Sequence, residues 1–444
     1  AQARPPRVFG RPAPPPFPSG DRACAVERYG AARGMEWLLV AIGIMVAVSA
    51  MMGAMGYRGR QQVVGIDLGT TFSVVAIKNG DEVTVVPDYF SGKPLVPSVV
   101  TFHPNGSTLV GSRAVALRGE FPLHTIFNAK RFLGRPFREC SKDAASHPFM
   151  VAANASDSSE DSLAGFAIPR RSDQVKEWVS PVEVGAAVLR HMKRSISERL
   201  GYTITKAVIC VPAKFSWRER KATSDAFEAA GFKVTRVLDE PTAAAIAYNL
   251  HKGTGIKYVL VYDIGGGTLD TSLLFMNGKS VSVLGVAGDD HLGGSDFDQR
   301  MRDLLESKLP AAERLQDGDR PELSCDRNGL LILAEQAKIE LSSQLDTEVR
   351  CLSEDGAAVR VVVTRAEFER FSQDLFERSM EPVSKVLEDQ MMTSENVDDI
   401  VLVGGASRTP RLRALLQEFF GDKRLHTEID PDVTVAWGAA NIVD

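Results

Sequence analysis

The segment Val259–Phe275, VLVYDIGGGTLDTSLLF, holds the pattern that decides the fold. The apolar residues at its two ends predict two β-strands. Three consecutive glycines and the acids Asp263 and Asp270 interrupt the apolar run. Glycine within a strand pattern usually marks a turn or a close approach of the backbone to another group. The segment therefore predicts a hairpin whose turn faces a ligand.

An earlier segment has the same arrangement. Val63–Ile77, VVGIDLGTTFSVVAI, places Asp67, Gly69, Thr70 and Thr71 between two apolar runs. Each of the two segments begins with a short apolar strand and enters a second strand after its turn. The chain therefore carries two similar hairpins, one in each half.

The later parts of the two halves also match. Residues 206–231 read KAVICVPAKFSWRERKATSDAFEAAG and residues 398–421 read DDIVLVGGASRTPRLRALLQEFFG. Both predict a strand, a loop and a helix, and the second loop carries Gly404 and Gly405 directly after its strand. Two similar α/β halves that face each other form a cleft, where ligands tend to bind. The repeat places both aspartate turns at one such cleft.

Helix signals occur in both halves. Pro181–Leu200 has a helical spacing of apolar residues and stops at Gly201. Glu219–Ala230 and Pro241–Leu250 predict two further helices, the second with proline in its first turn. We expect a long helical region over Phe297–Leu345.

Composition limits the classes of function. The 444 residues suffice for two lobes with separate cores, and the formal net charge of -5 argues against a large nucleic-acid surface. The five cysteines are scattered without a CxxC pair. This spacing does not predict a zinc site or a disulfide framework, but it leaves room for one isolated bridge.

The N-terminal region differs from the rest of the chain. Residues 1–34 are rich in Pro, Arg and Gly, so we expect a disordered tail or a stretch derived from an untranslated region. Residues 35–56, MEWLLVAIGIMVAVSAMMGAMG, are apolar enough for a signal sequence or a membrane anchor, which we place at 35–58. A buried core helix is the alternative, and the flanking charges leave the topology open.

The two hairpin turns predict a specific chemistry. A turn rich in Gly and Thr can direct several N–H and O–H groups at an anion. A neighbouring aspartate would repel a phosphate unless a divalent cation lies between them, and Mg²⁺ commonly joins carboxylates to phosphates. The pattern favours a Mg-nucleotide held between the lobes. The alternative is that both are ordinary surface turns.

The motifs GIDLGTT, NAKRFLGR, VPAKF, DEPTAAAIAY, DIGGGTLD, HLGGSDFD and VLVGGASRTP occur together, in this order. From about Val64 to Ala440 the chain therefore resembles the nucleotide-binding domain of the seventy-kilodalton heat-shock protein family, most closely its short microsome-associated type. The resemblance implies an α/β, actin-like ATPase fold with two duplicated lobes around a nucleotide cleft. Lobe I would cover 63–250 and lobe II 251–444, with the final helix returning toward lobe I.

The resemblance also implies slow ATP hydrolysis with Mg²⁺ and K⁺, and roles for particular residues. Asp67 and Asp263 would hold Mg²⁺ through waters, Lys130 would reach the γ-phosphate, and Glu240 and Asp270 would orient water and ions. The phosphates would contact Gly69, Thr70, Thr71, Gly265, Gly266, Gly267 and Thr268. Adenosine would contact Glu335, Lys338, Ser342, Gly404, Gly405, Arg408 and Asp432.

The chain departs from the family pattern at several positions. Ile339 stands where the family has an arginine that stacks on adenine, a loss on the order of 1 kcal/mol. Ala406 and Asp239 replace a serine and an asparagine, and Lys214 and Trp217 change a surface that relays the nucleotide state. The chain ends at Asp444, so the resemblance predicts no peptide-binding domain.

Three functions are compatible with these features. The first is a chaperone-like ATPase without a peptide clamp, and the second is an ATP-binding scaffold with little turnover. The third, a sugar or acetate kinase, would need an acceptor pocket that the sequence does not indicate.

The expected partners are nucleotide, J-domain co-chaperones, nucleotide-exchange factors or ubiquitin-like proteins, but no nucleic acid. We expect a monomer in the endoplasmic reticulum or microsomes, with the body lumenal and membrane association through residues 35–56 if they are not cleaved. The sequons at Asn105 and Asn154 are compatible with that compartment.

Overall fold

The computed structural model describes residues 37–51, 62–154, 157, 159, 161–169, 176–253, 255, 257–278, 280–315 and 321–442. The chain divides into two units, Ala1–Gln61 and Gln62–Asp444. In the first unit, residues 37–51 form a helix with exposed side chains. None of the described helices combines the length and apolar character needed to cross a membrane. The predicted tail at 1–34 and both ends of the predicted apolar segment lie outside the described residues.

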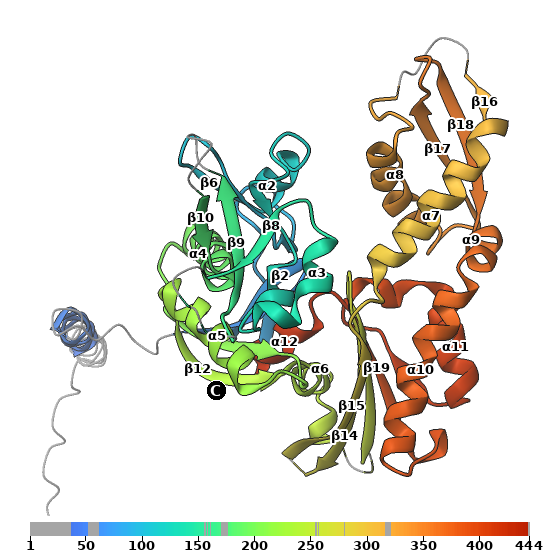
Figure 1. Ribbon diagram of the computed structural model, residues 1–444. Coiled ribbons are helices and arrows are strands. Elements are labelled where there is room, and N and C mark those ends of the chain that lie inside the picture. The colour runs from blue at the N-terminus through green and yellow to red at the C-terminus, as the bar shows by residue number, and fades with distance from the viewer. Residues whose placement is uncertain are drawn as a thin grey trace, which may run out of the picture. The chain divides into compact units, whose positions relative to one another are not determined.

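Lobe I is built on a six-stranded mixed sheet (Figure 1). The first two strands form the predicted hairpin, with Asp67 opposite Val74, and the first strand also pairs in parallel with a later strand. The order is β12 (Lys233–Asp239), β11 (Lys206–Val211), β1 (Val63–Leu68), β2 (Phe72–Asn79), β3 (Glu82–Val85), with β4 (Val96–Pro97) on β2. Two three-stranded sheets flank it: β10 (Lys176–Val179), β9 (Ala164–Pro169), β8 (Met150–Ala153); and β6 (Thr108–Val110), β5 (Val100–Phe102), β7 (Thr125–Ile126).

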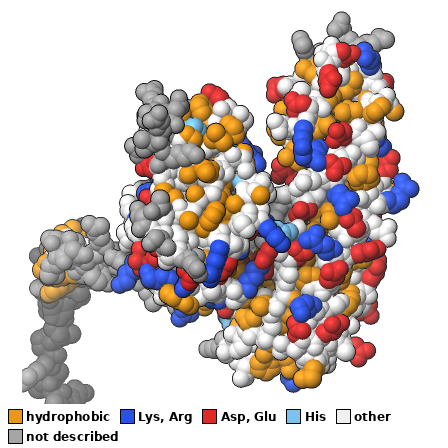
Figure 2. Space-filling model, in the orientation of Figure 1, with side chains coloured by type: hydrophobic (Ala, Val, Ile, Leu, Met, Phe, Trp, Pro, Cys, Tyr) orange, Lys and Arg blue, Asp and Glu red, His pale blue; other side chains and the backbone are white. Residues whose placement is uncertain are grey.

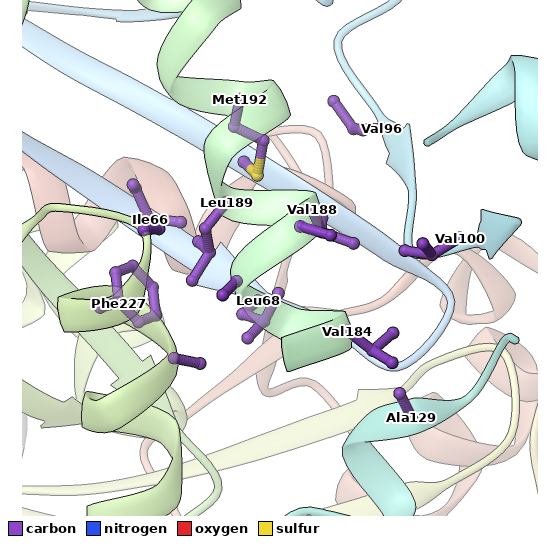
Figure 3. Packing of buried hydrophobic residues seen from close by; sticks show 14 of the residues in the cluster. Ile66, Leu68, Val96, Val100, Ala129, Val184, Val188, Leu189, Met192 and Phe227 are labelled. Carbon is purple, nitrogen blue, oxygen red and sulfur yellow. The ribbon is translucent and has the colours of Figure 1, made fainter. Parts of the chain in front are cut away.

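Helix α4 (Pro181–Leu200) forms over the predicted range and covers this sheet. Ser180 and Glu183 make a capping box at its start, and Gly201 adopts a left-handed conformation at its end. Its apolar residues Val188, Leu189 and Met192 belong to the core of the lobe, and Figure 3 shows Leu189 pointing toward Ile66 and Phe227. The other helices of the lobe are α2 (Ser112–Ala116), α3 (Ser141–Ala145), α5 (Trp217–Ala229) and α6 (Glu240–Ala247).

Lobe II repeats the hairpin topology of lobe I. The strand before the glycines pairs antiparallel with the strand after them, and Asp263 lies opposite Asp270. The first of these strands again pairs in parallel with a later one. The sheet order is β15 (Ser280–Asp289), β14 (Leu269–Asn277), β13 (Tyr258–Ile264), β19 (Asp399–Val403), β20 (Arg424–His426), and a smaller sheet contains β16 (Glu313–Arg314), β18 (Ala358–Thr364), β17 (Asp346–Leu352).

The expected long helical region over Phe297–Leu345 is wrong. Helix α7 (Gly294–Lys308) ends before Pro310, which cannot continue a helix, and α8 (Arg327–Glu340) begins with Asp326 as its N-cap. Between these helices, β16 pairs antiparallel with β18, which lies much later in the chain. The remaining helices are α9 (Arg365–Phe371), α10 (Gln373–Asp389), α11 (Pro410–Phe420) and α12 (Thr434–Asn441).

The helices of lobe II divide between its two sheets. Helix α10 packs on β14 and β15, with α11 beside it, and α7 and α8 lie with β17 and β18 (Figure 1). Acidic and basic side chains are interspersed over the visible face of α10 and α11 (Figure 2). The last helix, α12, packs on β1, β2 and α6, so the C-terminal part of the chain rests against lobe I.

A disulfide joins Cys325, directly before α8, to Cys351 in β17. Cys140 and Cys210 are buried free thiols. The sequence had left room for one isolated bridge without indicating its partners. This bridge closes a loop that contains the whole of α8.

Candidate functional site

The end of β1 brings a buried carboxylate to the first turn. Asp67 pairs with Cys210 of β11 on one side and Val74 of β2 on the other, which fixes its backbone. Its Oδ1 is buried and has no hydrogen-bond partner among the described residues. Burial raises the pKa of Asp67, and the charge of Lys130 opposes that rise. A buried polar atom without a partner indicates a place for a ligand or ordered water.

The end of β13 brings a second carboxylate to the second turn. The Gly265 N–H donates to the Thr268 carbonyl at 3.0 Å and closes the hairpin. Burial, reinforced by Glu240 and Asp270, raises the pKa of Asp263 well above its usual value. Such a carboxylate favours the approach of a cation, because a cation would restore its ionised form.

Lys130 and Glu240 form a buried pair beside these acids. The Lys130 Nζ donates to Glu240 Oε1 at 2.7 Å, and the side chains are only 9% and 12% exposed. Burial raises the pKa of Glu240 to about 7 even though Lys130 opposes the shift. Burial alone would lower the pKa of Lys130, but the attraction of Glu240, Asp67 and Asp263 raises it. The lysine therefore carries its positive charge into the cavity.

Two further basic residues connect the lobes across the turns. The Arg131 guanidinium donates to the carbonyls of Gly267 at 2.5 Å and Asp290 at 2.6 Å. The Lys214 Nζ lies 2.8 Å from Asp270 Oδ1 and also pairs with Asp290. Sequence reasoning missed Arg131 and Asp290, and it placed Lys214 on a relay surface. In the sequence these three residues stand out only because they lie within or next to the quoted motifs. Their contacts could not be predicted, because each partner is distant in the chain.

These groups line a single cavity of about 480 Å³. Pockets of this size accommodate small-molecule ligands. The predicted site residues in its wall are Asp67, Gly69, Thr70, Thr71, Lys130, Glu240, Asp263, Gly265, Gly266, Thr268, Asp270, Gly404, Gly405 and Asp432. Within the described part of the chain, five predicted residues lie outside that wall: Gly267, Glu335, Lys338, Ser342 and Arg408.

The predicted adenosine residues in and after α8 lie outside the cavity wall. On α8, Glu335 is exposed, and Ile339 is 60% exposed. Lys338 forms an ion pair with Asp298 of α7 at 2.6 Å and donates to the Gly294 carbonyl at 3.2 Å. Ser342, one turn further on, donates to the Lys338 carbonyl at 3.4 Å.

The third glycine element lies at the cavity wall. Gly404 has a φ of 79°, a left-handed conformation that suits glycine. A Cβ on Gly405 would lie 2.7 Å from Asp432 Oδ1, so this backbone passes close to the carboxylate. Arg408 pairs with Asp430 and with Asp432 at 3.2 Å. The ion pairs of Arg408 therefore hold the loop against the segment that contains Asp430 and Asp432.

The residues present fit a hydrated Mg²⁺ with a polyphosphate. Asp67 offers an unpartnered oxygen, Asp263 faces the same cavity, and the turns add threonine hydroxyls and glycine backbone. The described residues hold no cluster of three or more His, Cys, Asp or Glu side chains that could bind a metal directly. Mg²⁺ usually keeps several waters and takes one or two carboxylates, and Asp67 and Asp263 could serve as that pair.

The comparisons with known proteins agree with this geometry. The family model described as Hsp70 protein matches residues 63–444. The chain belongs to the Hsp70 family. Its two lobes are accordingly those of the actin-like ATPase fold, as the sequence predicted.

Two curated relatives show how much of an Hsp70 protein is present. Over 388 residues the chain is 39% identical to "Chaperone protein dnaK" of Cyanidioschyzon merolae (strain NIES-3377 / 10D), covering 85% of this chain and 61% of the relative. Over 425 residues it is 38% identical to "Heat shock 70 kDa protein BIP3" of Oryza sativa subsp. japonica, and this match covers 92% of this chain and 61% of the relative. The chain thus spans about three fifths of the length of these relatives.

Proposed function

We propose that the cavity between the lobes binds Mg-ATP and hydrolyses it slowly, as a chaperone-type ATPase. One observation carries the proposal: Asp67 and Asp263, from equivalent hairpins of the two lobes, face one cavity with the charged Lys130 between them. Two carboxylates that would repel a phosphate are compatible with one when a divalent cation lies between them.

Each group has a role that follows from its chemistry. Asp67 and Asp263 hold the hydrated Mg²⁺, which neutralises phosphate charge when bound. Thr70, Thr71 and Thr268 donate to phosphate oxygens. Lys130 stabilises the negative charge that develops on the transferred phosphoryl group. Glu240, which the bond to Lys130 fixes, orients the attacking water together with Asp270.

The nucleoside would lie toward α8 and the third glycine element. We assign its contacts to Glu335, Lys338, Ser342, Gly404, Gly405, Arg408 and Asp432. The exposed Ile339 offers an apolar surface to the base but no planar cation. The adenosine end therefore contributes less affinity than the phosphate end.

A lumenal location in the endoplasmic reticulum is part of the proposal. The Cys325–Cys351 disulfide supports it, because such bridges persist in oxidising compartments. The Asn105 side chain is exposed in the loop between β5 and β6, where a glycan could attach. We propose a monomer that meets J-domain co-chaperones, nucleotide-exchange factors or ubiquitin-like proteins.

An ATP-binding scaffold with little turnover is the second candidate. The bonds of Arg131 and Lys214 across the lobes favour it, because nucleotide in the cavity would then control how the lobes close. In that case the output is a protein contact, and binding without hydrolysis is expected.

Calorimetric titration of ATP tests whether the cavity binds a Mg-nucleotide. We expect the full chain to bind ATP with Mg²⁺ and to lose at least about tenfold in affinity with EDTA or in Asp67→Asn/Asp263→Asn. Asp81→Asn, in the exposed turn between β2 and β3, is the control and should bind normally. Equal ATP affinity with and without Mg²⁺ in every variant would contradict the proposal.

A further inference from the structure

Lys214 carries a second positive charge into the phosphate end of the cavity. It follows β11 in the loop before α5, on lobe I, and lines the cavity wall. Its ammonium group lies 2.8 Å from Asp270 Oδ1 and also pairs with Asp290, both on lobe II. Burial alone would lower the pKa of Lys214, but the two carboxylates raise it, so the group stays charged.

The charges of the surrounding carboxylates indicate which of them Lys214 neutralises. The carboxylates at and beside the two hairpin turns are Asp67, Asp263, Asp270 and Glu240, and the cavity wall also contains Glu139, Asp143, Glu219, Asp290 and Asp432. Lys130 neutralises Glu240, and a Mg²⁺ ion would neutralise Asp67 and Asp263. Asp270 is left beside the incoming polyphosphate, and without a cation the two anions would repel each other.

The other nearby cation does not serve Asp270. Arg131 directs its guanidinium at the backbone carbonyls of Gly267 and Asp290. Among the ion pairs of the described residues, the partner of Asp270 is Lys214.

We propose that Lys214 is a built-in monovalent cation, which holds the place beside Asp270 that a K⁺ ion would otherwise fill. An ammonium group and K⁺ carry the same charge and are similar in size, so one can replace the other against a carboxylate. The K⁺ that the family resemblance implies therefore does not fit at Asp270 of this chain. The inference rests on the proposed nucleotide site and adds that its affinity and turnover are independent of K⁺.

The test compares monovalent cations at equal ionic strength. Mg-ADP affinity, by calorimetry, and single-turnover ATP hydrolysis are measured for the full chain in KCl, NaCl and choline chloride. We expect wild-type values to agree within about twofold. In Lys214→Met, we expect affinity in choline chloride to fall by about tenfold, the scale of one hydrogen bond to a charged group. KCl or ammonium chloride should restore it.

A matched control separates charge in the cavity from charge on the surface. Lys221→Met removes an exposed lysine of α5 that pairs with Asp225, and it should bind Mg-ADP as the wild type does in all three salts. If Lys214→Met does not fold, Asp290→Asn leaves Lys214 beside Asp270 and should remain independent of the cation. The comparison of the wild-type chain in the three salts tests the inference even if no variant folds.

The outcomes are distinct. A wild-type chain that binds or turns over at least about tenfold better in KCl than in choline chloride overturns the inference but supports the nucleotide site. A Lys214→Met defect that neither K⁺ nor ammonium restores also overturns it, because the lysine is then only a bridge between the lobes. A wild-type chain that binds no nucleotide in any salt overturns the proposed function together with the inference.

Discussion

The phosphate end of the cavity consists of buried charged groups from both lobes, whereas the face of α8 carries polar residues on a largely exposed helix. At the phosphate end, Lys130 and Glu240 are close to fully buried and fixed by each other. On α8, Glu335 and Ile339 are open to solvent. A change at the phosphate end therefore disturbs several coupled groups, while a change at the exposed Glu335 or Ile339 disturbs few neighbours. The exposure of Ile339 fits the expectation from the resemblance, because replacing an arginine at this position would leave the core of the lobe unchanged.

The largest effect is expected from adding one methyl group at the phosphate end. A Cβ on Gly266 would overlap the side chain of Thr71 from the opposite hairpin. We expect Gly266→Ala to reduce ATP turnover by about a hundredfold, because the two turns could no longer align on one polyphosphate. Gly119→Ala, where nothing lies near the new Cβ, is the control. Similar rates for both variants would show that the turns do not act together.

The next effect concerns the anchoring of α8. The disulfide closes a loop of 26 residues, so Cys325→Ser/Cys351→Ser should lower the free energy of unfolding by about 3 kcal/mol. Urea denaturation with and without dithiothreitol measures it. The reductant should destabilise the wild type and leave the double variant unchanged. An equal response of both proteins would mean that the bridge does not stabilise this lobe.

The third effect is the pH dependence of stability at the phosphate end. The pKa of Glu240 is raised from 4.5 to about 7 by burial, so the folded chain keeps this proton to a higher pH than the unfolded chain. The resulting stability is present below pH 4.5 and is lost as pH rises through about 7. Against Glu240→Gln, nucleotide-free wild type should lose about 3 kcal/mol over this range. If the melting temperatures of the wild type and Glu240→Gln change with pH in the same way, the raised pKa of Glu240 is contradicted.

The smallest effect is expected on α8. Ile339→Arg should strengthen ATP binding by on the order of 1 kcal/mol, about fivefold, through a cation over the adenine ring. Affinity for tripolyphosphate, which has no base, should not change. If Ile339→Arg raises the affinity for ATP and for tripolyphosphate equally, the gain is general charge attraction. If it raises neither affinity, the adenine ring does not lie against residue 339.

The fold could be predicted well where signals are local. The two hairpins follow from apolar runs around Asp67 and Asp263, and α4 follows from its helical spacing of apolar residues and Gly201. The long helical region after Phe297 was predicted wrongly although Pro310 and the N-cap Asp326 are local signals that break it. What no local pattern encodes is the strand β16, which forms by pairing with the distant β18.

The candidate site could be predicted only in part for the same reason. The residues of each turn are neighbours in sequence, and the structure places Asp67, Thr70, Thr71 and Asp263 in one cavity. The pairing of Lys214 with Asp270 depends on how the lobes meet, which composition and periodicity do not contain. The Cys325–Cys351 bridge likewise required the register of β17 against the start of α8.

Single-turnover hydrolysis of ATP with Mg²⁺ by the full chain, beside Lys130→Ala and the surface control Lys221→Ala, tests the central claim most directly. We expect slow hydrolysis by the wild type and the control, and a rate lower by about 10²–10³-fold in Lys130→Ala with ADP affinity largely kept. Equal rates in all three proteins would contradict the assigned site. ATP binding without hydrolysis in the wild type would contradict the ATPase and favour the scaffold.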